Sequence, residues 1–207
     1  MISPEMLVRA VDGERDAACE LLKNNGDGLA PARVALRSYE VFEGMLAKAG
    51  HPKRAGLACK EGCAWCCRGV KVDVVAPEAL AIAEWMIRSF EPGELAELKA
   101  DVAAAFEATR ELSIDDRHAQ QTPCLFLDET GSCGIYPIRP MRCRGHISHD
   151  AAACERACKD TNSGLDVPAD LLTQQLSAVF SLGQQQVLSD DYFSPPATTR
   201  TPHPNSA

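Results

Sequence analysis

The sequence predicts a mainly α-helical fold with one short β-hairpin, arranged as a small cysteine-rich domain with flanking helices. Three observations indicate this class. Apolar side chains recur at helical spacing on both sides of a cysteine-rich middle region. Turn residues separate two short β-prone runs between residues 123 and 136. Hydrophobic residues make up 45% of the 207 residues, an ordinary proportion for a protein with a buried core.

The N-terminal segment, residues 1–55, is expected to be helical. Its apolar residues recur three and four positions apart, and Pro31 suits a first helical turn because its missing N–H is tolerated there. Gly50, His51 and Pro52 are expected to end this helical segment. The apolar positions that carry the pattern are Val34, Leu36, Tyr39, Val41, Phe42, Met45 and Leu46.

The middle segment, residues 56–160, is expected to hold the cysteine clusters and an inserted helical hairpin at residues 77–112. Pro77 marks the start of its first helix, and Pro92 with Gly93 separates the two helices. We expect the hairpin to pack over the cysteines through Trp85, Met86 and Phe106.

Residues 123–136 are expected to form the β-hairpin. Residues 124–127 and 133–136 would be its arms, and residues 128–132 its turn. A short helix is expected near residues 150–160, followed by a C-terminal helix within residues 161–188. The tail, residues 189–207, is expected to be disordered because it is rich in Pro, Ser, Thr and Asn and poor in apolar residues.

The net charge and the hydropathy of the sequence limit the kinds of binding partner that are expected. The net charge is -8 and no basic stripe is visible, so nucleic acid is not expected as a partner. No stretch approaches the roughly 18 consecutive apolar residues of a membrane span. The first residues lack a basic region followed by an apolar run, so we expect no secretory signal and a cytoplasmic protein.

Ten cysteines in a reducing compartment need an explanation. Disulfides are disfavoured there, and scattered buried thiols would not fall into clusters. Thiolates at short spacing favour soft metals, so metal binding is the leading interpretation, with disulfides and plain packing as alternatives. Zinc and iron, including an iron–sulfur cluster, both accept cysteine-rich sites, and the residues do not separate them.

The candidate ligands lie in two clusters. Neighbouring thiolates two or three residues apart can converge on one ion, but the adjacent Cys66 and Cys67 would point roughly 100° apart on a helix. A binuclear site and two separate sites are therefore both open. Cys154 and Cys158 have helical spacing and could add ligands, whereas Cys19 stands alone and is expected to pack in a helix. The candidate ligands are Cys59, Cys63, Cys66, Cys67, Cys124, Cys133 and Cys143.

Charged and nitrogen-bearing residues flank Cys143. Four thiolates on one zinc ion leave a net charge of about minus two, which Arg139, Arg142 and Arg144 could offset. Ordinary surface positions, or binding of an anionic substrate, are the alternatives for these arginines. His146 and His149, with Asp150, would offer nitrogen and carboxylate ligands if the metal were non-haem iron.

The cysteine pattern, together with one further string of residues, resembles the YkgJ-type cysteine-cluster proteins. The string is Cys133-Gly134-Ile135-Tyr136, then Arg139-Pro140, then Cys143-Arg144. The domain of this family is described as zinc- or iron-chelating, is named CxxCxxCC, and also occurs in the flagellin lysine N-methylase. The resemblance covers residues 57–147 and implies that the seven candidate cysteines bind metal.

Three classes of function remain open. The first is a structural or accessory metal-binding module that works with a protein partner. The second is an iron- or iron–sulfur-dependent enzyme for redox or group-transfer chemistry, by analogy with the methylase. The third is a metal-storage or sensing protein. Closed four-thiolate coordination would favour the first class, and an open coordination position the second.

Overall fold

The computed structural model describes residues 3–24, 28–48, 56–60, 62–69, 72–113, 116, 119–120, 122–160 and 169–190. The predicted helix end at residues 50–52 and residues 191–207 of the predicted tail lie outside these ranges. Residues 189 and 190 belong to the last helix.

The described residues are mainly α-helical, as predicted, and none of them lies in a strand. No helix among them has an apolar stretch long enough to cross a membrane. The helices in chain order are α1 (Pro4–Asn24), α2 (Ala30–Lys48), α3 (Trp65–Gly69), α4 (Ala76–Ser89), α5 (Pro92–Thr109), the 3₁₀ helix η1 (Tyr136–Ile138), α7 (Met141–Gly145), α8 (Ala151–Lys159) and α9 (Leu171–Asp190).

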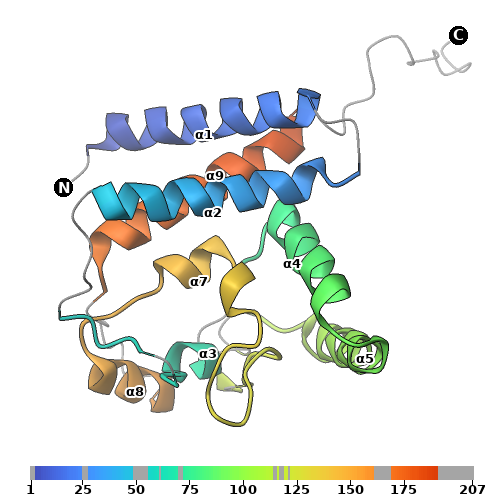
Figure 1. Cartoon of the computed structure of the whole chain (residues 1–207). Coiled ribbons are helices and arrows are strands. Elements are labelled where there is room, and N and C mark those ends of the chain that lie inside the picture. The colour runs from blue at the N-terminus through green and yellow to red at the C-terminus, as the bar shows by residue number, and fades with distance from the viewer. Residues whose placement is uncertain are drawn as a thin grey trace, which may run out of the picture.

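The helices form an upper layer and a smaller lower part (Figure 1). The long helices α1, α2 and α9 pack against one another in the upper layer, with α7 against α9 beneath it. Helices α3 and α8 pack together on the other side of α7, beside the loop that precedes η1. The lower part carries most of the cysteines.

The main hydrophobic core joins α2, α4, η1, α7 and α9. Phe42 of α2 and Phe180 of α9 meet edge to face with their ring centroids 6.1 Å apart, a favourable aromatic geometry. Met86 of α4 and Met141 of α7 are buried in the same cluster. This core fixes α7, and therefore Cys143, against the helical layer.

The predicted pair of helices at residues 77–112 is present as α4 and α5, but it does not cover the cysteines. Helix α4 packs against α2, and α5 has no buried residue. Only the start of α5 contacts the core, through Leu95 and Leu98. Phe106 is 61% exposed, so its predicted place over the site is wrong. Met86 instead fills the core, and Trp85 packs against Phe90 at a ring distance of 5.7 Å.

The predicted β-hairpin at residues 123–136 is also wrong. A single antiparallel bridge, between Leu127 and Cys133, closes the turn. The arms coil instead of extending, because Leu127 N–H donates to the Cys124 carbonyl (3.0 Å) and Tyr136 N–H donates to the Cys133 carbonyl (3.1 Å). These local bonds occupy backbone groups that a longer ladder would require.

Two glycines of the upper layer allow helices to approach closely. A Cβ at Gly145 of α7 would collide with the side chain of Ser177 of α9. A Cβ at Gly183 of α9 would lie 2.8 Å from the side chain of Glu14 of α1. Glu14 is itself buried, where it pairs with Arg37 of α2 at 2.7 Å.

Gly145→Ala should destabilise the protein because the added methyl group has no space between α7 and α9. The expected loss in the free energy of unfolding is about 1–3 kcal/mol. Gly13→Ala is the matched control, since a Cβ at that helical position meets nothing within 4 Å. It should stabilise by about 0.5–1 kcal/mol. Urea unfolding of both variants checks this, and equal stability of the two would contradict it.

Candidate metal centre

The first cysteine stretch, described at residues 59–60 and 62–67, turns tightly and leads into α3. Cys63 N–H donates to the Lys60 carbonyl at 3.0 Å. Gly62 has a φ of +78°, which a residue with a side chain rarely adopts. Cys66 and Cys67 follow in α3 with their Sγ atoms 4.0 Å apart. The turn and helix thus gather thiols within one short segment.

The second stretch is shaped by Asp128. Its carboxylate accepts the backbone N–H groups of Thr130 and Ser132, both at 2.8 Å. The hydrogen bonds from Thr130 and Ser132 hold the pKa of Asp128 below its usual value. This turn brings Cys133 back toward Cys124, and η1 then leads to Cys143 in α7.

The two stretches touch at two points. Cys124 N–H donates to the Cys67 carbonyl at 2.8 Å. The tips of the two turns also meet, since a Cβ at Gly131 would lie 3.0 Å from the Gly62 carbonyl oxygen. Cysteines far apart in the sequence are therefore neighbours in the fold.

A third segment reaches the same place from the start of α8. Ala58 N–H donates to the Ser148 carbonyl at 2.9 Å, and Ser148 N–H lies 3.2 Å from the Cys59 sulfur. Cys154 of α8 is close enough to Cys59 for its charge to raise the pKa of that thiol. All ten cysteines lie in the described residues, and none forms a disulfide.

Burial and thiol neighbours act together on the sulfur atoms. Burial, followed by the thiols of Cys124 and Cys67, raises the pKa of Cys143 to about 12. Burial also raises the pKa of Cys133, with Cys124 and Cys67 adding to it. As the side chains stand, no three Cys, His, Asp or Glu groups among the described residues are placed to hold one metal ion. Ligation by the predicted cysteines stays a prediction.

Cys66 and Cys67 share a hydrogen bond that shifts the pKa values of their two thiols in opposite directions. Donation from Cys66 lowers the pKa of Cys67 to about 7, and the nearby charges of Arg139 and Arg68 act in the same direction. The shared hydrogen bond and burial raise the pKa of Cys66. Cys67 is thus the thiol of this pair that ionises first, and thiolate is the form that binds metals.

Arg139 is the cation among the thiols. Its guanidinium stacks over the Tyr136 ring at 4.2 Å. Its Nε is buried and has no hydrogen-bond partner among the described residues. The positive charge of Arg139 helps to lower the pKa of Cys67, and it opposes the rise that burial causes in the pKa values of Cys59, Cys133 and Cys143.

Arg144 is directed toward α2 and away from the sulfur atoms. It donates to the carbonyls of Arg139 (3.0 Å) and Pro137 (2.7 Å), and it pairs with Glu43 at 3.2 Å. Its guanidinium lies 4.1 Å from the centre of the Tyr39 ring. Arg144 therefore braces the turn that carries Arg139.

His149 and Asp150 have structural contacts of their own, and His146 is partly buried. His149 lies 3.3 Å from the Gly56 carbonyl and 3.6 Å from the Asp170 carboxylate. Asp150 caps α8 by accepting Ala153 N–H at 2.9 Å. Burial lowers the pKa of His146. These contacts do not support the alternative in which His146, His149 and Asp150 bind non-haem iron.

Glu78 was not identified from the sequence as a site residue, yet it positions Cys143. The carboxylate is fully buried, and it accepts Met141 N–H of α7 at 2.7 Å and the N–H of Val75, the N-cap residue of α4, at 3.3 Å. It therefore joins the first turns of two helices. Burial raises its pKa, although these two hydrogen bonds and the charges of Arg144 and Arg142 oppose that shift. The Pro77-Glu78 pair at a helix start was the available signal.

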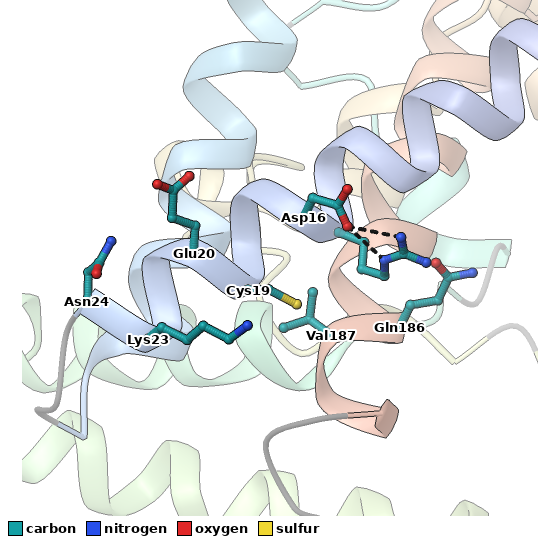
Figure 2. Close-up of a pocket in the computed structure, with 8 residues that line it drawn as sticks. Asp16, Cys19, Glu20, Lys23, Asn24, Gln186 and Val187 are labelled. Carbon is teal, nitrogen blue, oxygen red and sulfur yellow. Dashed lines mark hydrogen bonds and ion pairs between the residues drawn. The ribbon is translucent and has the colours of Figure 1, made fainter.

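A hollow of about 600 Å³ lies elsewhere, between α1 and the end of α9 (Figure 2). Cys19 lines it and also packs against the small apolar cluster of α1, α2 and α9, as predicted. Arg15, which also lines the hollow, pairs with Asp16 at 2.9 Å. The hollow contains none of the clustered cysteines.

The fold and these contacts define a helical, cysteine-rich protein with thiols from three chain segments gathered beside one arginine. Residues 58–159 match the sequence model of the CxxCxxCC family, described as a "Putative zinc- or iron-chelating domain". These residues, just under half of the chain, therefore carry the domain that the resemblance implied. The match extends to α8, so it includes Cys154 and Cys158. No curated protein and no solved structure is significantly similar to the chain.

Glu78→Ala should destabilise the protein because Met141 N–H would be left buried without an acceptor. The expected cost is about 1–3 kcal/mol in the free energy of unfolding. Glu78→Gln is the control, since its amide oxygen can still accept from Met141, and it should cost less at neutral pH. Denaturant unfolding distinguishes the two, and an Ala variant as stable as wild type would contradict the role.

The same residue predicts a pH dependence. The pKa of Glu78 is raised above its usual 4.5, so its contribution to stability is complete below that pH and is lost as the pH rises through the folded-state value. The stability of wild type minus that of Glu78→Gln should therefore fall as the pH rises from 4.5, in the metal-free protein.

Proposed function

We propose that the segment 56–160 chelates zinc or iron through Cys59, Cys63, Cys66, Cys67, Cys124, Cys133 and Cys143. In this proposal the metal serves a structural or accessory role. The supporting observation is the meeting of two distant cysteine stretches through the backbone bond between Cys124 and Cys67. Chain segments in such contact need only small side-chain movements to bring their thiolates onto a common ion.

The chemistry of the donors fits a thiolate-bound metal. Soft sulfur ligands favour zinc and iron over magnesium or calcium. The buried Nε of Arg139, which lacks a partner among the described residues, supplies a donor and a positive charge where thiolates would accumulate negative charge. Cysteines that were packed only as apolar side chains would require neither a buried hydrogen-bond donor nor a positive charge.

Chelation in this protein would include a rearrangement. Because no three ligand-type groups among the described residues stand ready to hold an ion, the sulfur atoms must move together as their protons leave. Binding should therefore order the lower part of the molecule more than the upper helical layer.

The structural role is favoured over the enzymatic one by the number of thiols. Seven candidate sulfur ligands suffice to close a four-coordinate site, and a closed site leaves no position for a substrate. An iron–sulfur enzyme with methylase-like or redox chemistry is the alternative. Thiolate ligands require a reducing compartment, so we place the protein in the cytoplasm, where an accessory role implies a protein partner.

Anaerobic purification followed by metal analysis and a visible spectrum tests this proposal. A colourless protein with zinc supports the structural role, whereas a brown protein with stoichiometric iron and sulfide supports the enzymatic alternative. A protein that binds neither zinc nor iron, with its thiols reduced, would overturn the proposal.

Cys63→Ala and Cys133→Ala should each lose bound metal and melt at a lower temperature. A hundred-fold loss of metal affinity would remove about 2.7 kcal/mol of stabilisation at excess ligand. Cys19→Ala is the control. Cys19 lies in α1, apart from the candidate metal ligands, so this variant should retain the full metal content. Elemental analysis and calorimetry provide the measurements. Full metal retention with normal melting in both variants would exclude these ligands.

Arg139→Gln should weaken metal binding by about 10- to 100-fold, the usual effect of losing a group that supports metal ligands. Arg139→Lys keeps the charge and should lose less. Arg156→Gln is the control, since Arg156 is exposed on α8 and 4.0 Å from Asp150. Competition with a chromophoric chelator measures the affinities. Unchanged affinity in Arg139→Gln would show that Arg139 does not offset thiolate charge.

A further inference from the structure

We propose that the thiols form two metal centres, with Cys154 as a ligand of the first. The first centre would contain Cys59, Cys63, Cys66 and Cys154, and the second would contain Cys67, Cys124, Cys133 and Cys143. This inference rests on the proposed chelating function and adds a stoichiometry and an eighth ligand to it.

The second set is held together by backbone contacts. Cys124 is bonded to Cys67 through the main chain, and Cys133 lies opposite Leu127 in the antiparallel bridge, close to Cys124. Cys143 lies in α7, and the thiols of Cys124, Cys67 and Cys133 are near enough to raise the pKa of its own thiol, after burial. These contacts bring the four cysteines into one region of the fold, from which side-chain movement could place their sulfur atoms on one ion, and four thiolates complete a tetrahedral zinc site.

The first set is assembled around Cys59 by a chain of hydrogen bonds. Ser148 bonds to the backbone at Ala58 and to the Cys59 sulfur, and its hydroxyl accepts Asp150 N–H at 3.1 Å. Asp150 in turn caps the first turn of α8, the turn that contains Cys154. The start of α8 is thereby held against Cys59.

The electrostatic neighbours of Cys59 agree with this arrangement. The thiols that raise its pKa, after burial, are Cys63 and Cys154. Cys158 is on the same helix, but the charges that act on its thiol are Arg68 and Lys159. The hydrogen bonds from Ser148 and Asp150 hold the first turn of α8, which contains Cys154, against Cys59, whereas Cys158 lies one turn further along the helix.

Cys66 and Cys67 lie at the boundary between the sets. Adjacent residues of a helix point about 100° apart, so the two sulfur atoms can serve different ions. The thiols that raise the pKa of Cys66 are Cys67 first, then Cys143 and Cys59, so Cys66 lies beside both sets. Because Cys67, Cys124, Cys133 and Cys143 already fill one four-coordinate site, Cys66 is left for the other.

Arg139 is placed to serve both sets. Its charge acts on Cys59 of the first set and on three cysteines of the second. Two four-thiolate zinc sites would together carry a charge of about minus four, which increases the need for a cation between them.

Zinc counting by native mass spectrometry and elemental analysis tests the two-centre arrangement. The full chain is purified anaerobically, reduced and loaded with zinc alone. Wild type should hold two zinc ions per chain, Cys154→Ala one, Cys133→Ala one, and the double variant none. Cys154→His should retain two because histidine can replace a thiolate on zinc. Cys158→Ala and Cys19→Ala, the matched controls, should also retain two.

One zinc ion in wild type overturns the two-centre inference and leaves the proposed function intact. Two ions retained in Cys154→Ala, or both ions lost in Cys154→Ala and in Cys154→His, also overturn it. No zinc in wild type would instead sink the proposed function itself, so the two failures are distinguishable.

Discussion

Ionised sulfur atoms in a partly buried space repel one another, and the arrangement of the lower part of this protein depends on how that repulsion is managed. Burial and neighbouring thiols raise the pKa values of Cys59, Cys133 and Cys143, so these thiols keep their protons when no cation is present. A metal ion would displace the protons and reverse the repulsion. In the metal-free protein the sulfur atoms do not hold one another in place. The backbone hydrogen bond from Cys124 N–H to the Cys67 carbonyl keeps the two cysteine stretches together instead.

The upper helical layer supplies the rest of that support. Its core joins α2, α4, α7 and α9 without requiring the clustered thiols, apart from the edge contact of Cys133. Glu78 links the first turns of α4 and α7, and Arg144 links the turn before α7 to α2. These two buried side chains thus transmit the geometry of the layer to Cys143 and Arg139. Metal binding would then complete an already supported region, which differs from a zinc finger that is unfolded without its ion.

The sequence was sufficient for features with a local signal. Apolar spacing identified the helices, and the cysteine spacing identified the segments that meet. The β-hairpin failed because Leu127 and Tyr136 use their N–H groups in local turns, which a short β-prone run does not reveal. Glu78 and the proximity of Cys154 to Cys59 could not be predicted, because both depend on contacts between segments far apart in the chain. For the same reason the roles of Arg139 and Arg144 were indistinguishable in a string that contains both.

The absence of a regular hairpin from the described loop also has a consequence for the site. In a β-ladder, successive side chains alternate between the two faces, and the spacing across strands is fixed at about 4.5–5.5 Å. Such a frame would hold Cys124 and Cys133 at one separation. The coiled arms around the single bridge leave the side chains freer to reorient, while Asp128 still fixes the tip of the turn through Thr130 and Ser132. The arms are joined by few backbone bonds, chiefly from Gly134 N–H to the Phe126 carbonyl (2.7 Å) and from Asp128 N–H to the Ser132 carbonyl (2.9 Å). A loop fixed at these points and at Cys124, without a regular ladder, is suited to thiols that must move inward to reach an ion.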